Sequence, residues 1–102
     1  MGARLVRDPD GTLRLTGELD LVSAEALGAE LLAAVDAAMP GRLDLDLSAV
    51  SYLASAGVGL LLEGLRRARA AGGRLHVHAD GSGPAARVLE LAGVDTALDS
   101  AD

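Results

Sequence analysis

The segment from Leu43 to Gly59 constrains the fold more than any other feature, because a strand pattern passes almost directly into a helix pattern. Leucine alternates with aspartate from Leu43 to Leu47, which is typical of a strand with one buried face. A short polar turn then leads to Ser55 and an apolar helix. The first amides of a helix lack partners and carry the positive end of its dipole. Ser55 therefore stands where a phosphate can be accepted.

Length and composition predict a single domain, residues 1–102, with an aliphatic core. The chain has 102 residues, 50% of them apolar, and its only aromatic residue is Tyr52. Binding of nucleic acid by base stacking is therefore excluded. The formal charge of −6 argues against nucleic acid and anionic membranes as partners.

The sequence carries no sign of export or of membrane insertion. Its first residues lack the apolar core of a signal peptide, and no later run is long enough to span a bilayer. The chain has no cysteine, so neither a disulfide framework nor a thiolate site is expected. We expect a cytoplasmic protein without membrane insertion.

Two short extended runs open the chain and predict a hairpin. They span Arg4 to Arg7 and Thr12 to Glu18, and they flank the turn sequence Asp8-Pro9-Asp10-Gly11. Later strands are expected from Leu43 to near Leu47 and from Arg74 to His78, with a last edge strand in residues 96–99.

Three helices are expected from apolar residues at helical spacing. Ser23 caps the first, which stops at Pro40-Gly41; the second begins at Ser55 and closes at Gly72-Gly73; the third runs from residue 82 to residue 93. The positions expected to face the sheet are Ala24, Leu27, Leu31, Leu32 and Val35 in the first helix, Val58, Leu61, Leu62, Leu65 and Ala68 in the second, and Val88, Leu89 and Leu91 in the third. The alternation predicts an α/β fold whose mixed sheet is parallel where helices make the crossovers.

Ser55 has two interpretations. The plain one is a helix N-cap, since serine is a favoured cap. The functional one is a phosphorylation site, which its small neighbours favour. Ala54, Ala56, Gly57 and Gly59 leave the first turn bare, so that a phosphate or another protein can approach the backbone.

Five sequence blocks resemble the STAS domain of bacterial anti-sigma factor antagonists. The blocks are Gly17-Glu18-Leu19-Asp20, Asp46-Leu47-Ser48-Ala49-Val50, Leu53-Ala54-Ser55-Ala56-Gly57-Val58-Gly59, Gly72-Gly73-Arg74-Leu75 and Val88-Leu89-Glu90-Leu91-Ala92-Gly93-Val94. The likeness extends from about Leu13 to Leu98. It implies a STAS-like mixed sheet of about four to five strands with an N-terminal hairpin, covered by about three to four helices.

The resemblance also implies a function. Ser55 would be phosphorylated by an anti-sigma factor that is also an ATP-dependent serine kinase, and a serine phosphatase would restore the binding form. Antagonist without phosphate would bind the kinase and release the sigma factor, since added charge at an interface changes affinity. The partner-binding residues implied are Asp20, Asp46, Ala54, Ala56, Gly57 and Val58, with both aspartates near Ser55.

The sequence departs from this family beside the serine. The usual motif there is Asp-Ser-Ser/Thr-Gly, whereas this chain has Ala54 and Ala56 on either side of Ser55. Losing the acidic neighbour removes a like charge from beside a phosphoserine, and it also removes a contact for a kinase.

No pattern of an enzyme or of a cofactor site is present. His76 and His78 share one face of a strand, but spacing places no third metal ligand beside them. Ser55 lacks the surroundings of a nucleophile, and Gly57-Val58-Gly59 with Gly64 is not a dinucleotide fingerprint. We expect no catalysis, no cofactor and no metal.

Two alternatives stay open at this level. One is a STAS scaffold, or the cytoplasmic accessory domain of a transporter or signalling complex, which is not phosphorylated. The other is a sensor that holds an anionic ligand at the helix start. The sequence also leaves open whether the chain is a monomer or a weak dimer.

Overall fold

A five-stranded sheet forms the centre of the computed structural model, which describes residues 2–79 and 97–98. Strand β1 pairs antiparallel with β2, whereas β2, β3, β4 and β5 are parallel neighbours in chain order. The elements are β1 (Ala3–Arg7), β2 (Leu13–Leu19), α1 (Leu21–Ala38), β3 (Arg42–Leu53), α2 (Ser55–Ala70), β4 (Arg74–Ala79) and β5 (Ala97–Leu98). The predicted α/β class, the N-terminal hairpin and the mixed sheet are confirmed.

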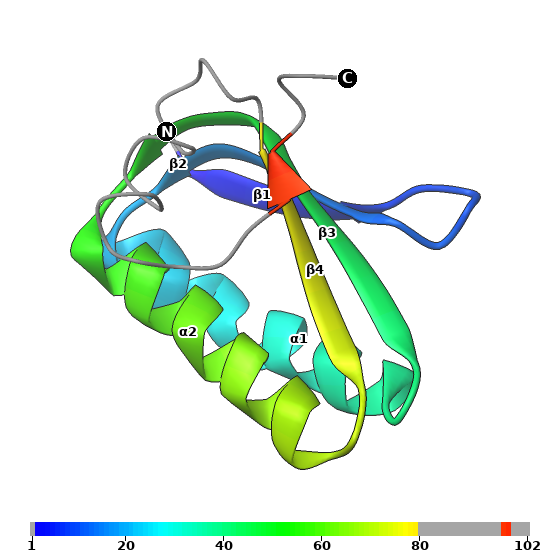
Figure 1. Cartoon of the computed structure of the whole chain (residues 1–102). Helices are drawn as coiled ribbons and strands as arrows, with labels where there is room; N and C mark the ends of the chain where they lie inside the picture. The colour runs from blue at the N-terminus through cyan, green and yellow to red at the C-terminus, as the bar shows by residue number, and fades with distance from the viewer. Residues whose placement is uncertain (1, 80–96, 99–102) are drawn as a thin grey trace.

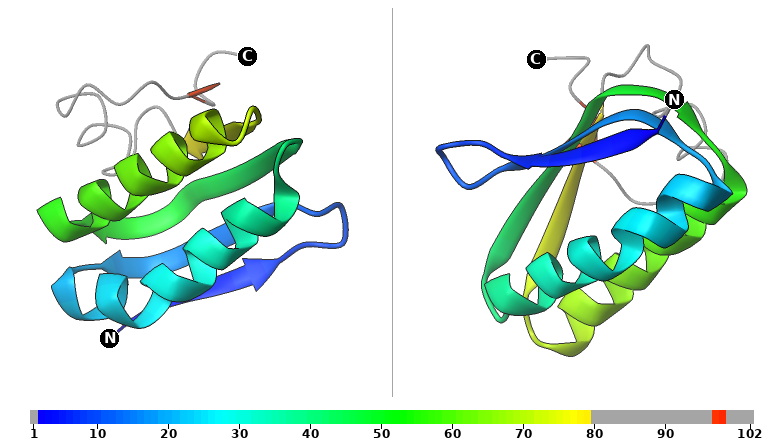
Figure 2. Two further views of the ribbon diagram at one scale, coloured as in Figure 1. Left: turned by 90° about the horizontal axis from the view of Figure 1, so that it is seen from below. Right: turned by 180° about the vertical axis from the view of Figure 1, so that it is seen from behind.

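Both described helices cover the same face of the sheet (Figures 1 and 2). Each joins two adjacent parallel strands, and the strands are added in one direction across the sheet. Since such crossovers are almost always right-handed, successive helices must lie on one side. The described residues place no helix on the other face.

The core lies between the sheet and the helices and is almost entirely aliphatic. Leu43, Leu45 and Leu47 of β3 are buried, as the alternation predicted, whereas Asp44 and Asp46 are partly exposed on the opposite face. The other fully buried large side chains are Leu15, Leu19, Leu31, Leu61, Val35 and Val77.

Helix α1 begins earlier than the sequence suggested. Its N-cap is Asp20, and Ser23 lies one turn inside the helix, so the prediction that Ser23 is the cap is wrong. The Asp20 carboxylate accepts from the Ser23 amide at 2.9 Å, and the Ser23 hydroxyl contacts the Asp20 amide at 2.9 Å. These reciprocal bonds form a capping box, which satisfies amides that the helix cannot pair internally.

Strand β3 continues past Leu47 to Leu53, so the expected polar turn before α2 is wrong. The pairing of β2 with β3 shifts register twice, between Arg14 and Thr16 and between Gly17 and Glu18. Bulges of this kind absorb extra residues without ending a strand. Polar residues in this part of β3 therefore belong to an irregular strand.

The predicted last edge strand is confirmed in its central residues by β5, Ala97–Leu98. The third helix predicted for residues 82–93 lies outside the described residues. Among the described residues, no helix is both long and apolar enough to cross a membrane.

Candidate functional site

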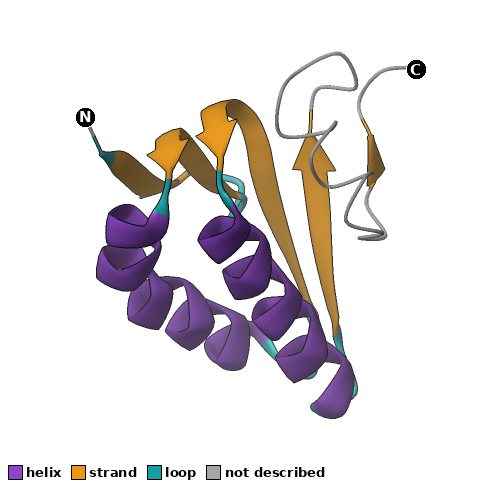
Figure 3. Cartoon of the chain, turned by 90° about the vertical axis from the view of Figure 1, so that its left-hand side faces the viewer, coloured by secondary structure: helices purple, strands orange, loops and turns teal. Residues whose placement is uncertain are grey.

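The two helices begin side by side at one end of the sheet, and this end is the candidate site (Figure 3). Strand β2 leads into α1 through Asp20, and β3 leads into α2 through Ala54. Leu19 and Leu53 are register partners, and the Ala54 amide donates to the Leu19 carbonyl at 2.9 Å. The positive ends of two helix dipoles therefore lie close together.

Ser55 is the first residue of α2 and its side chain is exposed. The N-cap is Ala54, which has no side-chain cap, so the interpretation of Ser55 as an N-cap is wrong. The Gly57 and Val58 amides both donate to the Ala54 carbonyl, at 2.9 and 3.1 Å. Within residues 2–79, no hydrogen bond reaches the amides of Ser55 and Ala56. The exposed hydroxyl of Ser55 thus belongs to the first residue of a helix that has no side-chain cap.

The other residues of this turn divide between surface and core. Ala54 and Ala56 are partly exposed, whereas Gly57 and Val58 are buried. A Cβ atom on Gly57 would lie 2.7 Å from Leu53 Cδ1 and 2.8 Å from Leu19 Cδ2. Gly57 therefore allows α2 to pack closely against β2 and β3, and its burial argues against direct contact with a partner.

Asp20 lies at the neighbouring helix start, where its carboxylate caps α1. The hydrogen bond from the Ser23 amide, and then the bond from the Ser23 hydroxyl, lower the pKa of Asp20 below its ordinary value. The carboxylate is thus ionised at neutral pH and already bonded within its own helix. It supplies a fixed negative charge beside the start of α2.

Asp46 does not lie at this site, contrary to the placement implied by the resemblance. It occupies the middle of β3, where its partners are Arg14 and His78. Leu53 follows Asp46 by seven positions, which corresponds to roughly 20 Å of strand. Its carboxylate accepts from the Ser48 amide at 2.9 Å, at one of the bulges. The continuation of β3 beyond Leu47 is the reason for this separation.

Three exposed apolar side chains in the same elements were missed by the sequence reasoning. Leu21 and Val22, in the first turn of α1, are 60% and 74% exposed, and Tyr52, near the end of β3, is 54% exposed. Taking Ser23 as the cap had left Leu21 and Val22 outside the helix. Recognising Asp20 and Ser23 as a reciprocal capping pair is the signal that would have found them.

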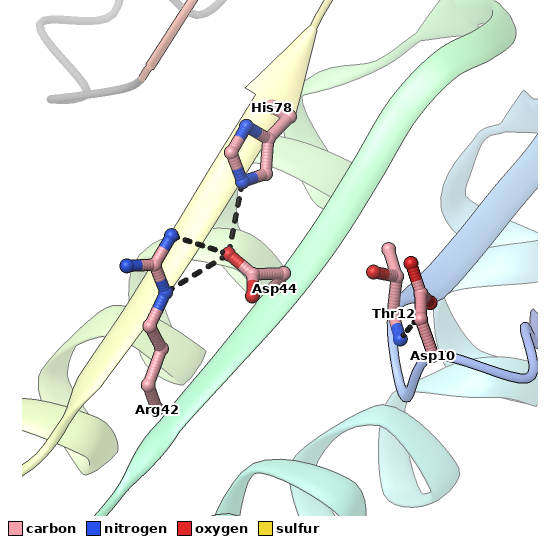
Figure 4. Close-up of polar contacts among 5 residues, drawn as sticks. All are labelled: Asp10, Thr12, Arg42, Asp44 and His78. Carbon is pink, nitrogen blue, oxygen red and sulfur yellow. Dashed lines mark hydrogen bonds and ion pairs between the residues drawn. The ribbon is translucent and has the colours of Figure 1, made fainter.

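A second polar cluster lies on the opposite face of the sheet, near the beginning of β3 (Figure 4). The His78 ring nitrogen Nε2 is 3.0 Å from Asp44 Oδ1, and the rings of His76 and His78 are 5.7 Å apart between centroids. The two histidines thus share one face, as predicted. Spacing along the strand placed no third potential ligand, and the pairing of β3 with β4 brings Asp44 beside the two histidines.

Figure 4 also shows Arg42 on the same carboxylate and, in the β1–β2 turn, Asp10 with Thr12. The Arg42 hydrogen bond, followed by that of His78, lowers the pKa of Asp44. The Asp10 carboxylate accepts from the Thr12 amide at 2.9 Å, which lowers the pKa of Asp10 and closes the hairpin turn.

The family model described as "Mlab, STAS domain" matches residues 5–99 of this chain. The search of curated proteins found no match to this chain. An anti-sigma factor antagonist from Mycobacterium paratuberculosis is 32% identical, with a TM-score of 0.75 over 94% of this chain and 82% of its own. Two further solved structures share the fold. The cell fate determinant SpoIIAA from Bacillus, in its phosphorylated form, is 24% identical, with a TM-score of 0.68 over 98% of this chain and 91% of its own. An anti-sigma-factor antagonist (STAS) domain protein from Planctomyces limnophilus is 19% identical, with a TM-score of 0.70 over 100% of this chain and 92% of its own. The chain belongs to the STAS domain family.

Proposed function

We propose that this chain is an anti-sigma factor antagonist whose binding to an anti-sigma factor kinase is controlled by phosphorylation of Ser55. The observation that carries the proposal is the exposed Ser55 hydroxyl on the first residue of an uncapped helix. The similarity to a solved antagonist at 32% identity supports it. The protein would act by binding, without catalysis of its own and without direct contact with nucleic acid.

The helix start provides a reason for phosphate to be tolerated at this position. The amides of Ser55 and Ala56 are not used within the described residues, and amides at a helix start are suited to bind an anion. Because neither Ala54 nor Ala56 carries a polar side chain, no neighbour in this turn competes for these donors. The departure from the usual motif therefore removes a kinase contact without removing the place for the phosphate.

The surrounding surface provides a reason for phosphate to change partner binding. Ser55 begins α2 beside the start of α1, whose first turn exposes Leu21 and Val22. An apolar surface of this kind favours a protein partner when it is neutral. Phosphate adds about −1.5 to −2 charges, and Asp20 already holds one negative charge at the adjacent helix start. Binding should therefore weaken when Ser55 is modified.

The kinase, a serine phosphatase and a cytoplasmic location belong to this proposal, as does the organisation of residues 1–102 as one domain. Ala54, Ala56 and Asp20 would border the contact. Asp46 is left out of this surface because of its position in the middle of β3.

Binding of three variants to a candidate anti-sigma kinase tests the proposal. Ser55→Ala should bind as the natural chain does but should resist release by ATP, and Ser55→Asp should bind at least about tenfold more weakly. The control is Ser48→Asp, which adds the same charge at an exposed serine of β3. Equal binding by Ser55→Asp and Ser48→Asp would contradict the switch.

The second candidate is a scaffold or transporter-accessory STAS domain that is not phosphorylated. The absence of polar neighbours beside Ser55 is the observation that favours it. Under this alternative, binding to the partner would be independent of ATP and of the charge at position 55.

A further inference from the structure

We propose that Asp44, His76 and His78 form a binding site for a divalent transition-metal ion on the sheet face opposite the helices. The three candidate ligand atoms, one from each side chain, all lie within 4.8 Å of one another. The site is separate from Ser55, since it lies near the beginning of β3 whereas Ser55 follows its end.

The backbone holds these three residues together. Asp44 and His76 are register partners in adjacent parallel strands, and His78 follows two residues later on the same face. Their neighbours Leu43, Leu45, Leu75 and Val77 are buried against the helices, so the sheet directs the three polar side chains away from the core. The arrangement therefore does not depend on a flexible loop.

The three ligand atoms would have to move only slightly closer to one another to bind one metal ion. Ligand atoms on a four-coordinate Zn²⁺ ion stand roughly 3.3 Å apart, because Zn–N and Zn–O bonds are about 2.0–2.1 Å long. The side chains of Asp44 and His78 are 32% and 25% exposed, which leaves them room to rotate. Two imidazoles with one carboxylate suit zinc and neighbouring transition metals better than Mg²⁺ or Ca²⁺.

One oxygen of Asp44 is available to a metal ion. Arg42 donates from Nε and Nη2 to Oδ1, at 3.1 and 2.9 Å, and His78 Nε2 contacts the same atom. Within residues 2–79 no hydrogen bond reaches Oδ2, and Figure 4 shows that oxygen without a dashed line.

One positive charge already stands beside this cluster, since Arg42 donates from Nε and Nη2 to Oδ1 of Asp44. Arg42 is the resident cation, and it opposes a metal ion through charge repulsion.

Titration of the whole chain with Zn²⁺, followed by calorimetry and by competition with a coloured chelator, tests the site. His76→Ala and Asp44→Asn should each weaken binding by at least about tenfold. Glu30→Gln, which removes an exposed carboxylate on α1, should leave it unchanged. Arg42→Ala should tighten binding roughly tenfold, the effect expected when one unit positive charge at a separation of roughly 6 Å from a divalent ion in water is removed.

Two results would overturn the proposal. One is no binding of Zn²⁺ by either the natural chain or Arg42→Ala. The other is equal affinity in the natural chain, His76→Ala and Asp44→Asn, all shown to be folded by circular dichroism. A rise in melting temperature with Zn²⁺ that is present in the natural chain and absent in His76→Ala would support the site independently.

Discussion

At the scale of single residues, two glycines on the first turns of α2 have opposite surroundings. Gly57 is buried against Leu19 and Leu53, whereas Gly59 is exposed, and a Cβ atom added to it would have no atom within 4 Å. The sequence shows only that both are small. The structure shows that one allows close packing and that the other contributes no contact.

Gly57→Ala should therefore destabilise the protein by about 1–3 kcal/mol, because the added methyl group overpacks a filled core. Gly59→Ala, in the same helix, should instead raise the free energy of unfolding by about 0.5–1 kcal/mol. Urea denaturation of both variants measures the difference. Equal effects of the two substitutions would show that the packing around Gly57 is looser than described.

Because of Asp44, the free energy of unfolding should fall as the pH is lowered into the acid range. The pKa of its carboxyl is lowered in the folded protein, so its stabilising contribution is complete above the pKa of the unfolded chain and is lost as pH falls through the folded pKa. The natural chain should exceed Asp44→Asn in stability at pH 7, and the difference should shrink below about pH 4. Urea denaturation at pH 7 and pH 3 measures this, and a constant difference would contradict the assigned ion pairs.

At the scale of elements, the sequence predicted what depends on local pattern. Alternation identified β3, and helical spacing identified α1 and α2. Strands β1 and β2 were predicted as short extended runs on either side of a turn sequence, and β4 as a short run after the second helix. The predicted end of β3 was wrong because Ser48 and Ser51 are of a type common in turns, whereas register shifts against β2 keep them in the strand. The start of α1 was wrong because Ser23 is a good cap in isolation, and only its bonds to Asp20 reveal its true position.

The two candidate sites, Ser55 and the Asp44 cluster, also differ in whether the sequence alone could predict them. Ser55 at a helix start was predictable, since one strand and one helix in sequence define it. The grouping of Asp44 with His76 and His78 was not, because it depends on the register between β3 and β4. Spacing along one strand carries no information about that register.

The uncapped start of α2 leads to a prediction about this element. Ala54 has the extended backbone of an N-cap, with φ −87° and ψ 170°, but no side-chain bond. Ala54→Asp and Ala54→Asn should each stabilise the protein by about 0.5–2 kcal/mol, since either side chain can accept from the Ala56 amide, which no hydrogen bond reaches within residues 2–79. Thermal and urea denaturation test this. The excess of Asp over Asn measures the favourable charge at the helix start, and a loss of stability in both would contradict the described cap geometry.

At the scale of the whole molecule, one sheet carries two separate regions. At one end of the sheet, the starts of α1 and α2 bring together Ser55, Asp20 and the exposed Leu21 and Val22. The sheet face opposite these two helices carries the Asp44 cluster, near the beginning of β3. Chain-order parallel strands produce this separation, because every described helix begins at the same end of the sheet. Loss of either region should leave the other intact.

The measurement that tests the central claim most directly is mass spectrometry after incubation of the chain with ATP and a candidate anti-sigma kinase. We predict one phosphate on Ser55, none on Ser55→Ala, and loss of the complex in proportion to the phosphate added. A folded chain that gains no phosphate with any such kinase, or that keeps its partner when Ser55 is fully modified, would contradict the account.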